Sequence, residues 1–493
     1  MSSYYDENTW HAMGDSADEG SDISRATLAY GLTDEQREWM TALVSEFYRH
    51  QDHNAVLKSY YDGDVRVYDY GMVSRIKNDQ TCHWPSQAVH ALASRVHFER
   101  FACEDGTAMS YIEDADAARS IVGGYNTFLP SKYLYGCMCA TVNNGADGRP
   151  YVTFHDATTF TAISDGDHVN GGRVAAGLVV ARVERPWWDR SRSVPTVLHL
   201  HLPNNTVEIV QKARGEWVAE QGRHVFDAPM MRVFSHESVG GSAPFGHTRI
   251  NRFVRTLTED AIRCMFHMQV SGTFYSMAKM YVTGLTDEQF DKMVADKDGY
   301  NLTRMLLLTA NDETDRDPNV GQLSGNSPQP FVEELRSLAA QFSGATGVPL
   351  NSLGIVQDNP SSAEAIQAAR EDICLVARRD IEADRLVLAD VADLVLAMNM
   401  YTSDAPVTAK FTNPLLTSMS AQADWAVKVN AVRPSFGETD VAARLMGFDD
   451  ADLADMHGDE DRAAARALIR SLAGNADADN GNASTEVVNA ATA

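Results

Sequence analysis

The sequence predicts an α+β protein, and three observations support this fold class. Short runs that alternate apolar and polar residues lie between residues 65 and 245, separated by Asn-Gly, Asp-Gly and Gly-Gly pairs, as is typical of antiparallel strands joined by turns. From His247 onward, helical periodicity replaces this alternation. The stretch from Ser362 to Ser403 contains neither Gly nor Pro, which predicts one very long helix of roughly 60 Å.

The composition is that of a globular protein with room for more than one core. The chain has 493 residues, of which 44% are hydrophobic and 22% charged. It contains no run of about 20 apolar residues, and its first residues do not combine a basic segment with an apolar one, so we expect neither a membrane-spanning nor a secreted protein. The six cysteines lack the dense, even spacing of a disulfide scaffold, which favours reduced thiols in a bacterial cytoplasm.

The chain is strongly acidic, with a formal net charge of −26 from 68 acidic and 42 basic residues. Such a surface repels phosphate and argues against tight wrapping of nucleic acid. It does not argue against a protein that surrounds DNA and lets it slide, because sliding requires weak contacts with few neutralised phosphates.

The first half of the chain carries clear signals for helices and strands. Thr33 and Gln36 form a predicted capping box at the start of the first helix. A second, short helix is expected at His53–Tyr61 and a third at Ser86–Phe98. The expected strands are Tyr133–Val142, Tyr151–Phe154, Val174–Val183, Val197–Leu202 and Val207–Val210.

The second half is expected to be mainly helical. Long helical periodicity covers Arg249–Tyr275, and a shorter helix is expected at Phe331–Phe342, with a strand-like run at Met305–Thr309 between them. The segment 344–360 cannot continue a helix because Gly and Pro interrupt it. The expected helices after the break at residues 434–437 are Thr439–Met446, Asp449–Met456 and Asp459–Leu472.

Two residue pairs were considered as metal ligands. Cys137 and Cys139 alternate in a predicted strand and face the same side, but no second pair stands at ligand spacing, so a structural role is favoured. His199 and His201 also share a face, and without an HExxH helix or a carboxylate motif we interpret them as a hydrogen-bonded surface pair. No cofactor is expected.

No enzyme motif stands out. The glycine-rich segment 344–354 lacks the Lys-Ser or Lys-Thr of a phosphate-binding loop, and no GxSxG elbow occurs. The adjacent Trp187 and Trp188 could stack on bases, but in an acidic protein they more often fill a small core or a subunit contact, which is the interpretation favoured here.

The order of segments resembles the portal proteins of tailed bacteriophages, specifically the siphophage type found in phages of actinobacteria. The residues that carry the resemblance are Trp84-Pro85 and the segments 246–275, 330–354 and 358–373. Portals of this type are ring oligomers, usually dodecamers, at one vertex of the capsid. The resemblance therefore implies a structural protein of the virion that is not an enzyme, with assembly in the host bacterial cytoplasm.

The resemblance divides the chain into named parts. These would be a disordered arm (1–22), the wing (23–245), a stem helix (246–278), the clip (279–328), a second stem helix (329–343), the tunnel loop (344–361), a long helix returning through the wing (362–412), the crown (413–474) and a disordered tail (475–493).

The resemblance also implies where partners bind. Double-stranded DNA would pass without sequence specificity along the tunnel-loop residues Asn351, Gln357, Asp358 and Asn359. The charged stem residues would be Arg249, Arg252, Arg255, Glu259, Arg263, Glu333, Glu334 and Arg336. The clip residues Asp312, Glu313, Asp315, Arg316 and Asp317 would dock partner proteins. Those partners would be the terminase large subunit and a head-tail adaptor, with the major capsid protein and scaffold contacting the ring elsewhere, and no membrane.

Two alternatives stay open. A phage DNA-processing enzyme such as a terminase motor would require a phosphate loop with its lysine and an acidic pair after a strand, and neither is found. A capsid or scaffolding subunit is the other alternative. A scaffold would lack the strand-rich middle, and a capsid protein would lack the long helix after the Gly/Pro segment.

Overall fold

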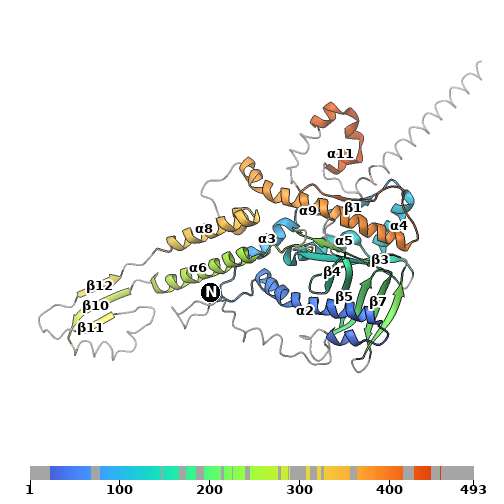
Figure 1. Ribbon diagram of the computed structural model, residues 1–493. Coiled ribbons are helices and arrows are strands. Elements are labelled where there is room, and N and C mark those ends of the chain that lie inside the picture. Colours follow the sequence, from blue (N-terminus) through green and yellow to red (C-terminus); the bar gives the residue numbers. More distant parts are fainter. Residues whose placement is uncertain are drawn as a thin grey trace, which may run out of the picture. The chain divides into compact units, whose positions relative to one another are not determined.

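The computed structural model divides the chain into two compact units, Met1–Pro414 and Leu415–Ala493, which are described separately (Figure 1). The residues that the structure describes are 23–67, 78–145, 148–165, 174–184, 194–212, 216–224, 226–238, 245–275, 279–286, 288, 307–310, 319–323, 327–355, 363–414, 427–445, 453 and 456. The combination of antiparallel sheets with long helices confirms the predicted α+β class.

A five-stranded antiparallel sheet forms one layer of the first unit. Its order is β4-β5-β6-β7-β8. The strands are β4 (Phe160–Ser164), β5 (Val174–Glu184), β6 (Val194–Leu202), β7 (Asn205–Gln211) and β8 (Trp217–Arg223), which include three of the predicted strands. The 3-10 helix η1 (Ile23–Leu28) and helix α2 (Asp34–Asp62) share a buried apolar cluster with one face of this sheet, where Leu43 and Phe47 join Leu198 and Leu200.

Helix α2 begins with the predicted capping box. Thr33 Oγ1 accepts from the Gln36 amide at 3.2 Å, and the Gln36 side chain accepts from the Thr33 amide at 3.0 Å. The expectation of a separate helix at His53–Tyr61 was wrong, because α2 is continuous to Asp62. The polar residues 51–54 do not break it, since Asn54 is buried and donates to the Ala157 carbonyl at 2.9 Å.

A second antiparallel sheet has the order β3-β2-β9, with strands β2 (Cys137–Asn144), β3 (Pro150–Asp156) and β9 (Met231–Ser235). One face meets the five-stranded sheet, where Cys139 and Val233 pack with Phe160 and Val179. The other face carries Met138 and Phe234 into the largest core. The helices that share this core include α3 (Trp84–Ala93), α4 (Gly106–Ala118), α5 (Ile121–Tyr135) and α9 (Ala363–Met398).

Two boundaries differ from the expectation, and two helices were missed. The strand expected from Tyr133 begins only at Cys137, because α5 extends to Tyr135 and ends at Gly136 in the left-handed conformation. The helix expected at Ser86–Phe98 ends at Ala93, and Phe98 instead begins β1 (Phe98–Ala102), which pairs with β13 (Thr408–Phe411). Helices α4 and α5 were not anticipated.

Helices α6 (Arg252–Tyr275) and α8 (Gln329–Thr346) pack against each other and form a helical hairpin (Figure 1). The intervening sequence contains β10 (Lys279–Leu285), β11 (Leu307–Ala310) and β12 (Asn319–Leu323), in the order β11-β10-β12. Strand β10 is parallel to β11 and antiparallel to β12. The predicted strand at Met305–Thr309 corresponds to β11.

Helix α8 continues to Thr346, past the expected end at Phe342, and is closed by Gly347 with φ of 70°. A short 3-10 helix, η4 (Leu350–Leu353), follows. The expectation that segment 344–360 could not continue a helix was therefore wrong for residues 344–346, since the glycine that adopts the left-handed cap is Gly347 and not Gly344. The long helix predicted after this segment is α9.

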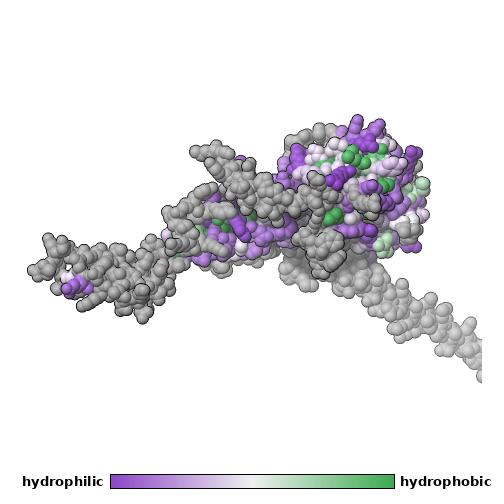
Figure 2. Space-filling view, turned by 90° about the horizontal axis from the view of Figure 1, so that it is seen from below, coloured by the Kyte–Doolittle hydropathy of each residue, from purple (hydrophilic) through white to green (hydrophobic). Residues whose placement is uncertain are grey.

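In the second unit, residues 427–432 are helical, and two short elements follow, η5 (Pro434–Glu438) and α11 (Asp440–Leu445). The latter lies within the helix expected at Thr439–Met446, whereas the other two expected helices fall mostly outside the described residues. Within the described part of the chain, no helix has the length and apolar character to cross a membrane. Where residues are coloured in Figure 2, the surface is mostly hydrophilic, with small hydrophobic spots.

Candidate functional site

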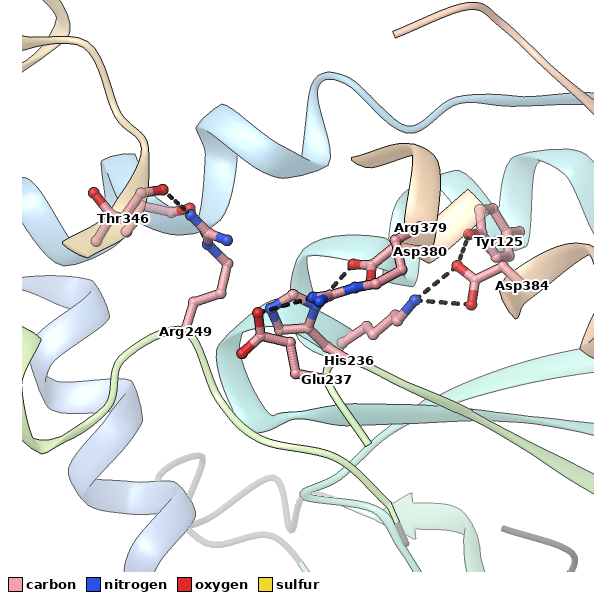
Figure 3. A network of polar contacts seen from close by, with 10 residues as sticks. Tyr125, His236, Glu237, Arg249, Thr346, Arg379, Asp380 and Asp384 are labelled. Carbon is pink, nitrogen blue, oxygen red and sulfur yellow. Dashed lines mark hydrogen bonds and ion pairs between the residues drawn. The ribbon is translucent and has the colours of Figure 1, made fainter. Parts of the chain in front are cut away.

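Two aspartates of α9 enter the core of the first unit one helical turn apart. Asp384 is 1% exposed and accepts from Lys132 of α5, whose Nζ lies 2.8 Å from both carboxylate oxygens. The hydroxyl of Tyr125, also on α5, donates to the same carboxylate (Figure 3). Burial raises the pKa of Asp384, even though the charge and hydrogen bonds of Lys132 act to lower it. The ion pair joins α9 to α5 in a place that water does not reach.

Asp380, on the previous turn, binds a histidine at the end of β9. Its Oδ2 lies 2.7 Å from Nδ1 of His236, and both side chains are buried. The ring of Tyr133 meets the His236 ring edge-on at 5.0 Å between centroids. Burial acts to raise the pKa of Asp380, but the hydrogen bond from His236 and the charge of Lys132 outweigh it, so this pKa lies below its usual value. Asp380 thus joins α9 to the β3-β2-β9 sheet.

Arg249 connects the helical hairpin to the same core. Its Nε donates to the Ala88 carbonyl of α3 at 2.8 Å, and its Nη2 donates to the Thr346 carbonyl in the last turn of α8 (Figure 3). Its backbone amide donates to the Tyr133 carbonyl at 3.0 Å. Burial lowers the pKa of the Arg249 guanidinium. The side chain of Arg249 therefore fixes the end of α8 beside α3, and its backbone amide adds a bond to the end of α5.

The backbone around Gly246 is packed too closely for any side chain. Gly246 has φ of 84°, and a Cβ there would lie 2.3 Å from the His236 carbonyl oxygen. The amide of His247 donates to that carbonyl at 2.7 Å, and the amide of His236 donates to the Gly136 carbonyl at 2.9 Å. This contact holds Gly246 and His247, which precede α6, against the end of β9.

We call Tyr125, Lys132, His236, Arg249, Asp380 and Asp384 the junction cluster. Its buried charges face one another, so the arrangement holds elements together and presents no activated nucleophile. Within the described ranges, no group of three or more His, Cys, Asp or Glu side chains is placed to hold a metal ion. The junction cluster therefore has a structural role, because its hydrogen bonds and ion pairs join α9, α8 and the two-sheet body.

Most of the junction cluster escaped the sequence analysis. Arg249 was expected as a charged residue of an exposed helix, but α6 begins only at Arg252 and the Arg249 side chain points into the body. The sequence contains one sign of this buried cluster, which is the position of Asp380 and Asp384. They lie at i, i+4 spacing on the same helical face as the apolar residues Ala377, Ile381 and Leu388.

The other predicted charged residues of the helical hairpin do not converge on one site. Arg255 lies over the ring of Tyr60 at 5.9 Å, and Glu259 accepts from the Tyr60 hydroxyl. Arg263 pairs with Asp260 within α6. Exposed positions are occupied by Arg252, Glu333, Glu334 and Arg336.

Few of the predicted loop residues fall within the described part. Asn351 is exposed in η4. The residues that lie outside the described ranges are Gln357, Asp358, Asn359, Asp312, Glu313, Asp315, Arg316, Asp317, Trp187 and Trp188.

In each pair of cysteines and histidines, one residue is fully buried, Cys139 or His201, and the other, Cys137 or His199, is half-buried. Cys137 and Cys139 pack in the apolar cluster between the two sheets, and burial raises the pKa of Cys137 to about 12. His199 and His201 are not a surface pair as expected, since His201 is fully buried and its Nε2 has no partner among the described residues. Burial also lowers the pKa of both imidazoles. The error arose because alternation shows that two residues share a face, but not which layer covers that face.

Comparison with known proteins identifies two sequence relatives. The chain is 27% identical over 172 residues to the portal protein of Mycobacterium phage D29, and 28% identical over 125 residues to that of Mycobacterium phage L5. The first match spans 34% of this chain and 34% of the relative, and the second spans 25% of each. These relatives confirm the resemblance to portal proteins of phages of actinobacteria. No family model matches the chain.

Solved structures show weaker likenesses. The neck of a native GTA particle, computed with C12 symmetry, aligns with 74% of this chain and 90% of its own at 13% identity and a TM-score of 0.39. An HK97 family phage portal protein from Corynebacterium diphtheriae aligns with 69% and 93% at 12% identity and a TM-score of 0.32. Scores of this size do not establish a common fold.

Proposed function

We propose that this chain is the subunit of a portal ring at one vertex of a phage capsid, through which DNA enters during packaging and leaves during ejection. The observation that carries the proposal is the sequence similarity to two proteins named portal proteins, across up to 172 residues. The role is structural and not enzymatic. The ring would be a dodecamer in the virion, assembled in the host cytoplasm.

The described elements fit this role in their order along the chain. The two-sheet body would be the wing, α6 and α8 the stem, the β11-β10-β12 sheet part of the clip, and α9 the helix returning through the wing. A clip facing outward would dock the terminase large subunit and later a head-tail adaptor, through residues such as Asp312 and Arg316. The capsid protein and scaffold would contact the ring elsewhere.

The junction cluster has a specific task under this proposal. The tunnel loop joins the end of α8 to the start of α9, so any force that moving DNA exerts on the loop acts on both helices. Arg249 holds the last turn of α8, while Asp380 and Asp384 hold α9. Buried charge pairs separate only at high cost, so the ends of the loop would stay fixed while its middle yields.

The net charge of −26 per subunit supports a channel in which DNA slides. A ring lined by carboxylates repels phosphate, and the tunnel-loop residue Asp358 would add to this lining, beside the neutral residues Gln357 and Asn359. Asn351, which is exposed in η4, would be another neutral contact.

Electron microscopy of the purified chain tests the ring directly. We expect closed rings with a central hole, whereas stable monomers with nuclease or ATPase activity would overturn the proposal.

In phage, Asp358→Lys should leave rings intact but reduce packaged DNA, because a ring of lysines would hold phosphates. Glu113→Lys is the matched control, since Glu113 is exposed on α4 and should tolerate the same charge change. Equal DNA content in both variants would count against the DNA-facing role of Asp358.

A further inference from the structure

A cavity of about 1260 Å³ opens at one end of the five-stranded sheet. Its walls come from the start of α2, the turn between β6 and β7, the segment 226–229 and the last turns of α9. Small-molecule sites occupy roughly 300–1,000 Å³, so this volume is larger than such ligands need and suits a peptide segment. Neither the junction cluster nor any predicted site residue uses it.

The cavity combines acidic and apolar surface. Five of its lining residues are exposed carboxylates, against a single arginine, Arg232. These carboxylates are Glu35, Asp165, Asp227, Asp390 and Asp393. Burial raises the pKa of Asp393, and the charge of Asp390 raises it further. Apolar lining comes from Trp39, Phe226, Val387 and Leu394. A segment that carries both arginine and aromatic side chains matches these walls.

The chain contains one segment of this chemistry in residues 185–193, Arg-Pro-Trp-Trp-Asp-Arg-Ser-Arg-Ser. It has three arginines against one aspartate, and it includes the adjacent Trp187 and Trp188. We call it the Trp-Arg segment. It joins β5 to β6, whose last paired residues are Glu184 and Val194. Tryptophan and arginine are the side chains that most often dominate the energy of protein interfaces.

The topology places the cavity and the two residues that flank the Trp-Arg segment at opposite ends of the same strands. Val174 at the start of β5 and Leu202 at the end of β6 line the cavity, whereas Glu184 and Val194 lie at the other end. The 11 residues of β5 span roughly 33 Å. A nine-residue connection that must return to Val194 reaches at most roughly 17 Å from the strand ends. It therefore cannot enter the cavity of its own chain.

We propose that the Trp-Arg segment of one copy docks into the acidic cavity of the next copy. The contact is head-to-tail, because one end of the sheet supplies the segment and the opposite end supplies the cavity, and repeated contacts of this kind close a ring when the rotation permits. The inference rests on the proposed portal ring and identifies the surfaces that join its subunits.

Two variants test the contact from its two sides. The segment variant, Trp187→Ala with Trp188→Ala, keeps the cavity, and the cavity variant, Asp390→Lys with Asp393→Lys, keeps the segment. Native mass spectrometry should show that each variant alone loses rings, while a mixture forms dimers of one subunit of each kind, since one intact contact can form. The matched control, Glu371→Lys with Asp372→Lys, places the same charge change on α9 roughly 30 Å away and should assemble normally.

A peptide measurement remains decisive even if a variant assembles poorly for reasons of folding. A fluorophore-labelled peptide of residues 185–193 should bind the full-length segment variant, whose cavity is intact, and should bind the cavity variant at least about tenfold more weakly. Rings in both variants, or equal peptide binding to both, would overturn this inference while leaving the portal proposal standing. Absence of rings in the unsubstituted protein would overturn the portal proposal instead.

Discussion

Replacing Lys132 with methionine tests the junction cluster most directly. The Lys132 and Asp384 side chains are 0% and 1% exposed, with 2.8 Å between Nζ and the carboxylate oxygens. At an effective dielectric constant of 20, the attraction over that distance is roughly 6 kcal/mol, but burying each ion costs several kcal/mol, so the intact pair contributes little. Lys132→Met removes the attraction and leaves the buried carboxylate, which should cost about 3–5 kcal/mol of unfolding free energy.

The double variant Lys132→Met with Asp384→Leu is the control, because it removes both charges and keeps the volume. We expect its unfolding free energy to lie within about 1 kcal/mol of that of the unsubstituted protein. Urea unfolding at fixed protein concentration, followed by circular dichroism, measures both values. A single variant that loses less than about 1 kcal/mol, or a double variant as unstable as the single one, would refute the reasoning.

The pH dependence of Lys132→Met supplies an independent check. Burial already raises the pKa of Asp384, and loss of Lys132 removes an influence that lowers it. The folded variant then binds its proton more tightly than the unfolded chain, so its stability rises as the pH falls through the raised pKa. The deficit relative to the unsubstituted protein should therefore be smaller at pH 5 than at pH 8. A deficit that does not change with pH would contradict this account.

Three further predictions concern the same region. Asp380→Asn should lower stability at neutral pH, and because the Asp380 pKa is depressed in the folded state, the deficit should shrink below about pH 3.9, as measured by urea unfolding across pH. Arg249→Ala removes the charged donor that binds the Ala88 and Thr346 carbonyls and should cost about 1.5–3 kcal/mol for each lost hydrogen bond, with faster hydrogen exchange at the end of α8. Arg252→Ala, at an exposed position, should change stability by less than about 0.5 kcal/mol. Gly246→Ala should lower the melting temperature, because its Cβ would meet the His236 carbonyl oxygen. Gly272→Ala, which has open space around it in α6, should instead stabilise the protein by about 0.5–1 kcal/mol. The opposite ranking of the two variants would contradict the conclusion that close backbone packing requires glycine at position 246.

Local patterns predicted the elements whose signals lie within a few residues. The capping box of Thr33 and Gln36, the strands at Val174–Val183 and Val197–Leu202, and the helix α9 all follow from side-chain spacing and from the placement of Gly and Pro. Such signals are local because a cap or an apolar stripe involves residues at most one or two turns apart. The resemblance to portal proteins likewise followed from the order of these segments.

The helices α4 and α5 show where local patterns fail. Helix α5 contains two glycines and Pro130, and its sequence lacks a clear apolar stripe. It is nevertheless helical because burial of Tyr125, Leu129 and Tyr133 in the largest core outweighs weak intrinsic propensity.

The acidic composition, the α+β class and the elements with strong local signals, such as α2, β5, β6 and α9, can be deduced from the chain's residues. The pairing of Lys132 with Asp384, across 252 positions, and of His236 with Asp380, across 144, depends on how the layers pack. The same holds for the cavity, whose lining brings together residues of α2, β5, β6 and α9. Residue spacing encodes contacts within an element, whereas these contacts form between elements that only the packed core brings together.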